Sequence, residues 1–297
     1  MGEELCHRHL PQRSLAVGKY DAQKGEEVVT NLCRSLPALA KLGDVRHPRL
    51  LLLSVPAACL LAACGASART QAVDGGGAKH VVRHCRPGLK TVGSKRVAVA
   101  AVVVGHARAF RRPGRRPFAS FGRVNVNGYP TTFQVRAALR RRDCSSSWFR
   151  VQLPIRPNGV TGFIRAHTVE VGRVRTRILV DISARKLTLF RRGRPVLRTK
   201  VAVGSHATPT PTGRYYVNQR LIPADPSGPY GPAALGVSAF SNVLTGWTQG
   251  GPIGIHGTNE PWSIGHAVSN GCIRLRNSVL RRVFSQTRAG TPVIIRR

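Results

Sequence analysis

Ser269-Asn270-Gly271-Cys272-Ile273-Arg274 is the stretch of this sequence on which its interpretation rests. The cysteine follows a glycine, which leaves the backbone open to an approaching substrate, and His256 lies sixteen residues earlier. A cysteine that attacks an acyl group needs a base to form its thiolate and N–H donors to hold the oxyanion. The pattern therefore predicts Cys272 as a nucleophile and His256 as its base. No histidine follows Cys272, so the order differs from that of papain-like endopeptidases.

His266 is a competing candidate for the base because it lies only six residues before Cys272. We favour His256 because it follows an apolar run, residues 252–255, that predicts a strand able to hold it rigidly. His266 lies instead in a glycine-containing loop.

A third motif lies upstream, Thr208-Pro209-Thr210-Pro211-Thr212-Gly213, where the prolines and glycine predict a rigid loop. Together with the motif around His256, Ile255-His256-Gly257-Thr258, and the one around Cys272, it resembles the L,D-transpeptidase catalytic domain over about residues 174–297. The resemblance implies a β-sandwich-like fold and peptidoglycan stem peptides as substrate. It also implies a reaction that needs no metal or cofactor, and inhibition by carbapenem-type compounds.

The same resemblance implies roles for single residues. Cys272 would be the nucleophile and His256 the base, with the Gly257 carbonyl fixing the imidazole tautomer. Backbone N–H groups of Gly271 and Cys272 would form the oxyanion hole. Arg274 would either grip a substrate carboxylate or brace its loop, and the two readings are equally supported.

Three further site residues are weaker candidates. Asn270 stands where the family usually has a histidine, so the pair of Cys272 and His256 would work without a second imidazole. Tyr230 and Trp262 are candidate pocket walls. Tyr230 falls in a Gly/Pro/Ser-rich stretch, residues 223–236, that predicts a long mobile loop or lid.

The composition favours a mostly β protein, because 31 glycines and 20 prolines predict loops and short strands more than long helices. Residues 95–171 resemble a bacterial SH3-like barrel, through the turns Asn125-Val126-Asn127-Gly128 and Asn158-Gly159 and the short strands around them. We expect this small β domain to precede a catalytic domain over residues 172–297.

The apolar stretch at residues 50–63 follows Arg46 and Arg49 and is too short to span a membrane. It predicts a lipoprotein-type signal peptide over residues 46–63, with lipidation of Cys64. An ordinary cleaved signal or a buried apolar strand is the alternative. We expect an exported protein, at the outer face of the cytoplasmic membrane or in the cell wall, anchored through Cys64.

The regions on either side of the signal follow from it. Residues 1–45 form a doubtful leader, and one hypothesis is that translation begins near Val45. Residues 64–94 lack a periodic pattern and predict a flexible tether. Outside the leader and signal, Cys85, Cys144 and Cys272 remain, and three pairings are open. A disulfide between Cys85 and Cys144 would leave Cys272 free.

The formal net charge of +35 predicts a polyanionic neighbourhood: nucleic acid, an anionic membrane surface or an anionic cell-wall polymer. The arginines are scattered through every segment and the chain carries an export signal. We therefore expect no nucleic-acid partner and favour the membrane surface or the wall polymer.

The predicted function is a peptidoglycan L,D-transpeptidase that forms 3-3 stem-peptide cross-links through a cysteine thioester and releases D-alanine. Alternatives are an L,D-carboxypeptidase on the same stems, a sortase, and a catalytically dead wall-binding lipoprotein. In a sortase the assisting arginine should lie further beyond the cysteine than Arg274 does. If the site is active, we expect Cys272 to react with electrophiles at neutral pH faster than free cysteine, and to lose this in His256→Ala.

Overall fold

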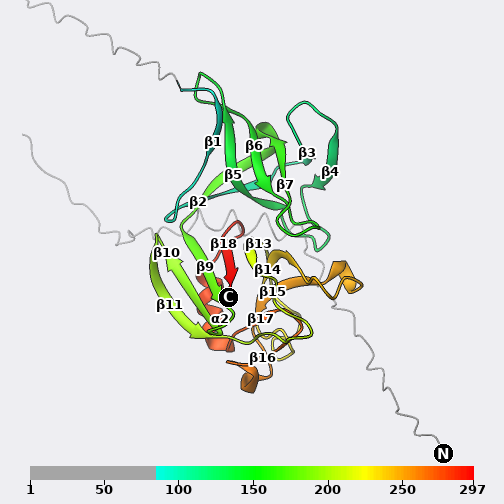
Figure 1. Ribbon diagram of the computed structural model, residues 1–297, viewed down its shortest axis with the longest axis vertical. Helices are drawn as coiled ribbons and strands as arrows, with labels where there is room; N and C mark the ends of the chain where they lie inside the picture. Colours follow the sequence, from blue (N-terminus) through cyan, green and yellow to red (C-terminus); the bar gives the residue numbers. More distant parts are fainter. Residues whose placement is uncertain (1–84) are drawn as a thin grey trace, which may run out of the picture. The chain divides into compact units, whose positions relative to one another are not determined.

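The structure is a computed structural model that describes residues 85–297. The predicted leader, signal peptide and lipidated Cys64 lie outside the described residues. Within them the chain is mostly β, as predicted, and its strands form two large sheets with separate hydrophobic cores (Figure 1). No helix of this part of the chain is long and apolar enough to cross a membrane.

The first sheet covers residues 88–174 and runs β4-β3-β7-β6-β5-β2-β8, with β1 paired to β5. Inward side chains such as Phe133, Val151 and Ile164 are fully buried, and β5 is buried along most of its length. The SH3-like assignment of residues 95–171 stays a prediction. The strands are β1 Gly88–Thr91, β2 Ala98–Val103, β3 His106–Phe110, β4 Pro117–Gly122, β5 Thr132–Arg140, β6 Ser146–Gln152, β7 Thr161–Arg165 and β8 Val169–Val174, with a 3-10 turn at Ala166–Thr168.

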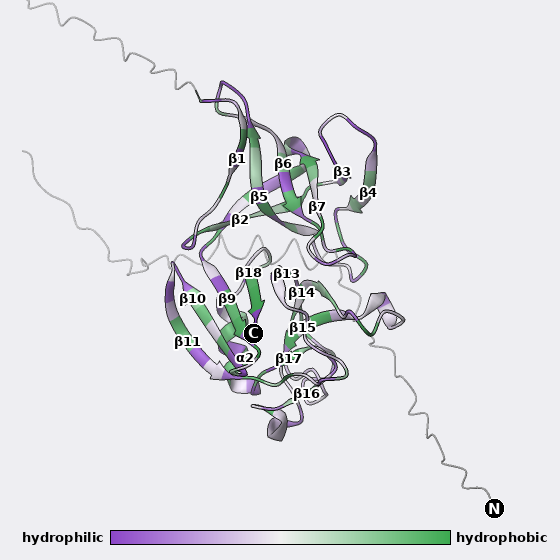
Figure 2. Ribbon diagram, viewed as in Figure 1, coloured by the Kyte–Doolittle hydropathy of each residue, from purple (hydrophilic) through white to green (hydrophobic). Residues whose placement is uncertain are grey.

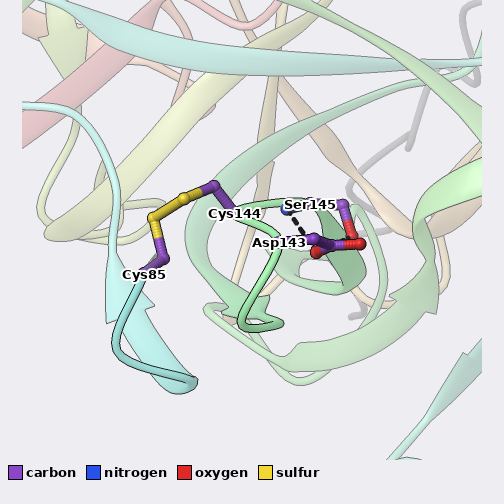
Figure 3. The surroundings of a disulfide bond; sticks show 4 residues. All are labelled: Cys85, Asp143, Cys144 and Ser145. Atoms are coloured by element: carbon purple, nitrogen blue, oxygen red, sulfur yellow. Dashed lines mark hydrogen bonds between the residues drawn. A yellow bond between two sulfur atoms is a disulfide. The ribbon is translucent and has the colours of Figure 1, made fainter. Parts of the chain in front are cut away.

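The flexible tether predicted over residues 64–94 extends too far at its C-terminal end, because part of it is a strand. Gly88–Thr91 form β1, which pairs antiparallel with β5, and Cys85 is joined to Cys144 by a disulfide (Figure 3). Cys144 lies in the β5–β6 turn, where Asp143 accepts hydrogen bonds from the backbone and hydroxyl of Ser145. Gly-Leu-Lys-Thr carries no alternating apolar pattern, so only the pairing with β5 makes it a strand. The structure contains one of the three cysteine pairings left open by the sequence.

The second sheet runs β11-β10-β9-β18-β13-β14-β15-β17. Its core includes Ile178, Leu187, Leu235 and Ile255, and Figure 2 shows hydrophobic residues along β15 and β18. The strands are β9 Thr176–Asp181, β10 Lys186–Arg191, β11 Arg194–Lys200, β13 Gly213–Leu221, β14 Ala234–Phe240, β15 Pro252–His256, β17 Ile273–Arg274 and β18 Pro292–Arg296; β12 Val203–Gly204 pairs separately with β16 Ala267–Ser269, and 3-10 turns lie at Thr248–Gly250 and Pro261–Ser263.

One α-helix lies in the described part of the chain, α2 at Asn277–Gln286. It follows directly after the cysteine motif. Leu280 and Val283 are fully buried in the core of the second sheet, so the helix covers part of that core.

The long loop predicted over residues 223–236 is shorter than expected. β14 begins at Ala234, and Leu235 is fully buried between its neighbouring strands. The start of β14 was missed because the residues before Ala233 are rich in glycine and proline, and an apolar run begins only at Ala233. The remaining loop carries Tyr230 toward β15.

Candidate functional site

The candidate site is built on two neighbouring parallel strands, β15 and β17. Their register places Ile255 opposite Ile273 and His256 opposite Arg274. Cys272 directly precedes β17, and its Sγ accepts a hydrogen bond from the backbone N–H of Gly254 at 3.4 Å. Alternate residues of a strand face the same side. Gly254 and His256 are alternate residues of β15. The thiol of Cys272 therefore lies beside the strand that carries His256.

Gly254 donates its N–H to the thiol and also lies close to the imidazole. A Cβ placed on this residue would stand 3.7 Å from Cδ2 of His256. A larger side chain at position 254 would therefore crowd the space beside both reactive groups.

His256 is held as a neutral imidazole in one tautomer. Its side chain is buried and its Nδ1 lies 2.6 Å from the Gly257 carbonyl oxygen, which can only accept, so Nδ1 carries the proton. Nε2 is then the basic nitrogen. The pKa of His256 is lowered to about 4, mainly by burial and to a smaller extent by the charge of Arg274, while the Gly257 hydrogen bond acts in the opposite direction.

Tyr230 packs edge-on against this imidazole, with the ring centroids 5.0 Å apart. Burial raises the pKa of the Tyr230 phenol, so the ring is uncharged at neutral pH. The contact places Tyr230 at the wall of the site and limits the rotation of the imidazole.

The thiol of Cys272 is also neutral at rest. Burial raises its pKa above the ordinary 9.0, although the Gly254 hydrogen bond and the charge of Arg274 act in the opposite direction. The resting pair is thus a thiol and an imidazole, not a thiolate and an imidazolium. The raised pKa favours a slower reaction with electrophiles than the sequence alone led us to expect, because desolvation disfavours the thiolate.

Arg274 braces the wall of the site. Its Nη1 forms an ion pair with Oε2 of Glu260, across the loop that joins β15 to β16. Its Nε is buried and has no hydrogen-bond partner in the described part of the chain. The guanidinium therefore keeps one buried donor without a partner, and its charge acts on Cys272.

Residues 208–213, the Thr-Pro loop, bind the backbone of residues 269–272, the cysteine loop. The Thr210 hydroxyl donates to the Gly271 carbonyl at 2.9 Å and accepts from the Gly204 N–H at 2.8 Å. The Thr208 hydroxyl donates to the Ser269 carbonyl at 3.0 Å. Two motifs sixty residues apart along the chain are joined in this way.

The structure gives Gly271 a different role from the oxyanion donor that the resemblance implied. Its N–H already donates to the Ser269 hydroxyl at 3.2 Å, and that hydroxyl donates to the Cys272 carbonyl. Gly271 has a φ of 106°, and a Cβ there would lie 3.0 Å from Ile253. Glycine is needed here for backbone conformation and space.

The remaining candidates lie as follows. Asn270 is exposed, and the Thr208 hydroxyl lies 3.5 Å from its Oδ1. Trp262 is 65% exposed in the 3-10 turn at Pro261–Ser263, and no contact links it to the pair. His266 is exposed, whereas His256 ends β15 and is buried.

Comparison with known proteins bears on the same segment. Residues 175–295 match the family model of the L,D-transpeptidase catalytic domain. This segment belongs to the L,D-transpeptidase family. The motifs around Cys272 and His256 lie inside it.

Curated relatives carry the same family name. YkuD of Bacillus subtilis (strain 168), named as an L,D-transpeptidase, is 40% identical over 120 residues, which cover 40% of this chain and 65% of the relative. Its counterpart in Bacillus licheniformis is 39% identical, covering 40% of this chain and 64% of the relative. The matched region therefore spans a little under two thirds of the length of these relatives.

Solved structures of L,D-transpeptidases also match. The E. faecium catalytic domain is 24% identical, covering 41% of this chain and 96% of that domain, with a TM-score of 0.31. The enzyme from Mycobacterium smegmatis is 19% identical, covering 51% of this chain and 78% of that one, with a TM-score of 0.33.

Three residues of the L,D-transpeptidase domain were missed from the sequence. Gly254 adjoins the thiol, Glu260 pairs with Arg274, and the Asn277 Oδ1 accepts the Thr258 N–H at 2.8 Å. The only available signal was a glycine within an apolar strand, which often marks a close approach of another group. The Glu260 and Asn277 contacts depend on the parallel pairing of β15 with β17.

Proposed function

We propose that this protein is a peptidoglycan L,D-transpeptidase that forms 3-3 cross-links through a Cys272 thioester. The observation that carries the proposal is the placement of a free thiol directly before β17 and of a single-tautomer imidazole at the end of the adjoining strand β15. The family assignment supplies the substrate class, the stem peptides of peptidoglycan.

In the first half-reaction, Nε2 of His256 takes the thiol proton while Sγ of Cys272 attacks the carbonyl carbon of the third stem residue. Both groups are neutral at rest, so proton transfer accompanies attack and no stable thiolate is needed. The C–N bond to the terminal D-alanine then breaks. The departing amine takes the proton from His256, which leaves a thioester and neutral imidazole.

In the second half-reaction, the side-chain amine of a neighbouring stem's diamino acid attacks the thioester carbonyl. His256 accepts a proton from that amine, the C–S bond breaks, and the proton returns to the Cys272 sulfur. The new amide joins two third residues. Water in place of the amine would give an L,D-carboxypeptidase.

Arg274 stabilises charge in this scheme. Its Nε is buried and unpartnered in the described structure, its charge acts on the thiol, and its pairing with Glu260 orients the guanidinium. We expect it to orient a substrate carboxylate or the tetrahedral oxyanion, instead of the N–H of Gly271.

We also propose that the reaction takes place outside the cytoplasmic membrane. The Cys85–Cys144 disulfide supports this, since such bonds persist in oxidising compartments. The predicted signal and Cys64 anchor agree with the same location.

The decisive experiment incubates the protein with purified tetrapeptide-containing wall and analyses the digested products by mass spectrometry. We expect dimers joined through their third residues and released D-alanine, both lost in Cys272→Ala and in His256→Ala. D-alanine release without dimers would favour the carboxypeptidase. Neither product, together with no carbapenem adduct on Cys272 by intact mass, would identify a dead site and overturn the proposal.

A further inference from the structure

A cavity of about 500 Å³, whose lining includes neither Cys272 nor His256, is lined in part by five basic residues. They are Lys95, Arg136, Arg150, Arg177 and Arg214. No acidic residue of the described chain lines it, and none of the five takes part in the ion pairs found between residues 85 and 297. The cavity therefore concentrates positive charge that nothing in this part of the protein neutralises.

The arginines of this basic cavity are constrained. Arg136 contacts Oε1 of Gln152, and Nε2 of Gln152 donates to the Arg214 carbonyl at 2.9 Å. Arg177 stacks over Phe190, with its guanidinium carbon 4.5 Å from the ring centroid. Such anchoring orients the charged groups before a ligand arrives, which lowers the entropic cost of binding.

The charges are also under electrostatic strain. Burial and the nearby charge of Arg214 both lower the pKa of Arg136. The Nε of Arg177 is buried without a hydrogen-bond partner in the described structure. An anion in the cavity would relieve the repulsion between the guanidinium groups.

The rest of the lining is largely uncharged. Leu89, Val92, Val97, Pro292 and Ile294 provide apolar surface around the arginines. A cavity of this size exceeds a single phosphate ion and lies in the range of small-ligand sites. This mixture of basic and apolar residues suits a ligand whose phosphate groups are separated by short, uncharged polyol units.

We propose that the basic cavity binds a polyol phosphate, a ligand in which phosphate is esterified to glycerol or a similar alcohol. Planar guanidinium groups match phosphate oxygens in two-point contacts, and the apolar wall covers the alcohol carbons. This chemistry occurs both in soluble glycerol-phosphate polymers and in lipid headgroups. The inference does not depend on the reaction proposed for Cys272.

The test measures binding of a fluorescent glycerol-phosphate oligomer to the 297-residue chain, and of the chain to phosphatidylglycerol vesicles, at physiological salt. The test variant is Lys95→Gln/Arg214→Gln, in which both positions are exposed. Arg281→Gln/Arg282→Gln, on the exposed face of α2, is the matched control because it also removes two positive charges.

We expect the test variant to weaken binding at least about tenfold and the control to weaken it by less than about threefold. Loss in the oligomer arm identifies a soluble polymer as the source of the phosphate, and loss in the vesicle arm alone identifies a lipid headgroup. The oligomer should also raise the melting temperature of the wild type and the control, but not of the test variant. Equal weakening by both variants in both arms would show general charge attraction and overturn the proposal.

Discussion

Single residues of the site are tuned by burial more than by neighbouring charge. Burial is the largest cause of the low pKa of His256 and of the raised pKa of Cys272. The two shifts act in the same sense, because each disfavours the charged partner of a thiolate–imidazolium pair. Both shifts therefore favour a neutral thiol and a neutral imidazole at rest.

This arrangement predicts slow alkylation of Cys272 by iodoacetamide. At pH 7 the reaction should be slower than that of free N-acetylcysteine, and the rate should rise only as the pH exceeds the ordinary thiol pKa of 9.0. Peptide mapping after timed quenching measures the alkylation rate of Cys272 alone. Rapid alkylation with a plateau near neutral pH would show a preformed thiolate instead.

His256 should also make stability depend on pH. The unfolded imidazole binds its proton near 6.5 and the folded one only near 4, so acid favours the unfolded state. The stability conferred by the neutral imidazole is present above pH 6.5 and is lost as the pH falls toward 4, by about 3 kcal/mol.

The measurement is urea unfolding of the wild type and His256→Gln at pH 7.5 and pH 4. The loss between the two pH values should be smaller in His256→Gln by about 3 kcal/mol, because glutamine does not titrate. Equal losses in the two proteins would mean that the imidazole is protonated in the fold as easily as in water.

At the scale of elements, the site depends on the Thr-Pro loop that holds the cysteine loop. Thr210→Val should leave the Gly204 N–H and the Gly271 carbonyl without their buried partner. We expect a loss of about 3 kcal/mol in the free energy of unfolding and at least about a tenfold slower acylation of Cys272 by a carbapenem.

Thr212→Val is the matched control, because Thr212 lies in the same loop but is exposed. It should change stability by less than about 0.5 kcal/mol. If the two valine variants behaved alike, the hydroxyl of Thr210 would not be what secures the cysteine loop. Chemical denaturation and stopped-flow acylation measure the two effects.

The elements differ in how far the sequence could predict them. The apolar run before His256 predicted β15, because a continuous apolar stretch that ends in a polar residue suits a buried strand. β1 was missed, since Gly88–Thr91 becomes a strand only through its pairing with β5. The candidate nucleophile and base were also predicted from local motifs, and their catalytic roles stay predictions. Glu260 and Asn277 were not, because their contacts arise only when β15 and β17 lie side by side.

At the scale of the whole molecule, the Cys85–Cys144 disulfide joins the segment before β1 to the β5–β6 turn of the first sheet. Cys85 and Cys144 are 59 residues apart, and the loop-entropy account of a cross-link of this length gives about 4 kcal/mol. Cys85→Ala/Cys144→Ala should lose a comparable amount of stability. Thermal unfolding with and without dithiothreitol measures it: the reductant should lower the melting temperature of the wild type and leave the double variant unchanged. A wild type insensitive to complete reduction would contradict this.

The disulfide also has a mechanical consequence. It joins residue 85, where the described chain begins, to the β5–β6 turn, and it therefore precedes β1 along the chain. A force applied through the preceding residues reaches a covalent bond before it reaches the hydrogen bonds between β1 and β5. β1 is shielded from such a force, so the first sheet can bear tension applied through the residues that precede Cys85 without separation of β1 from β5.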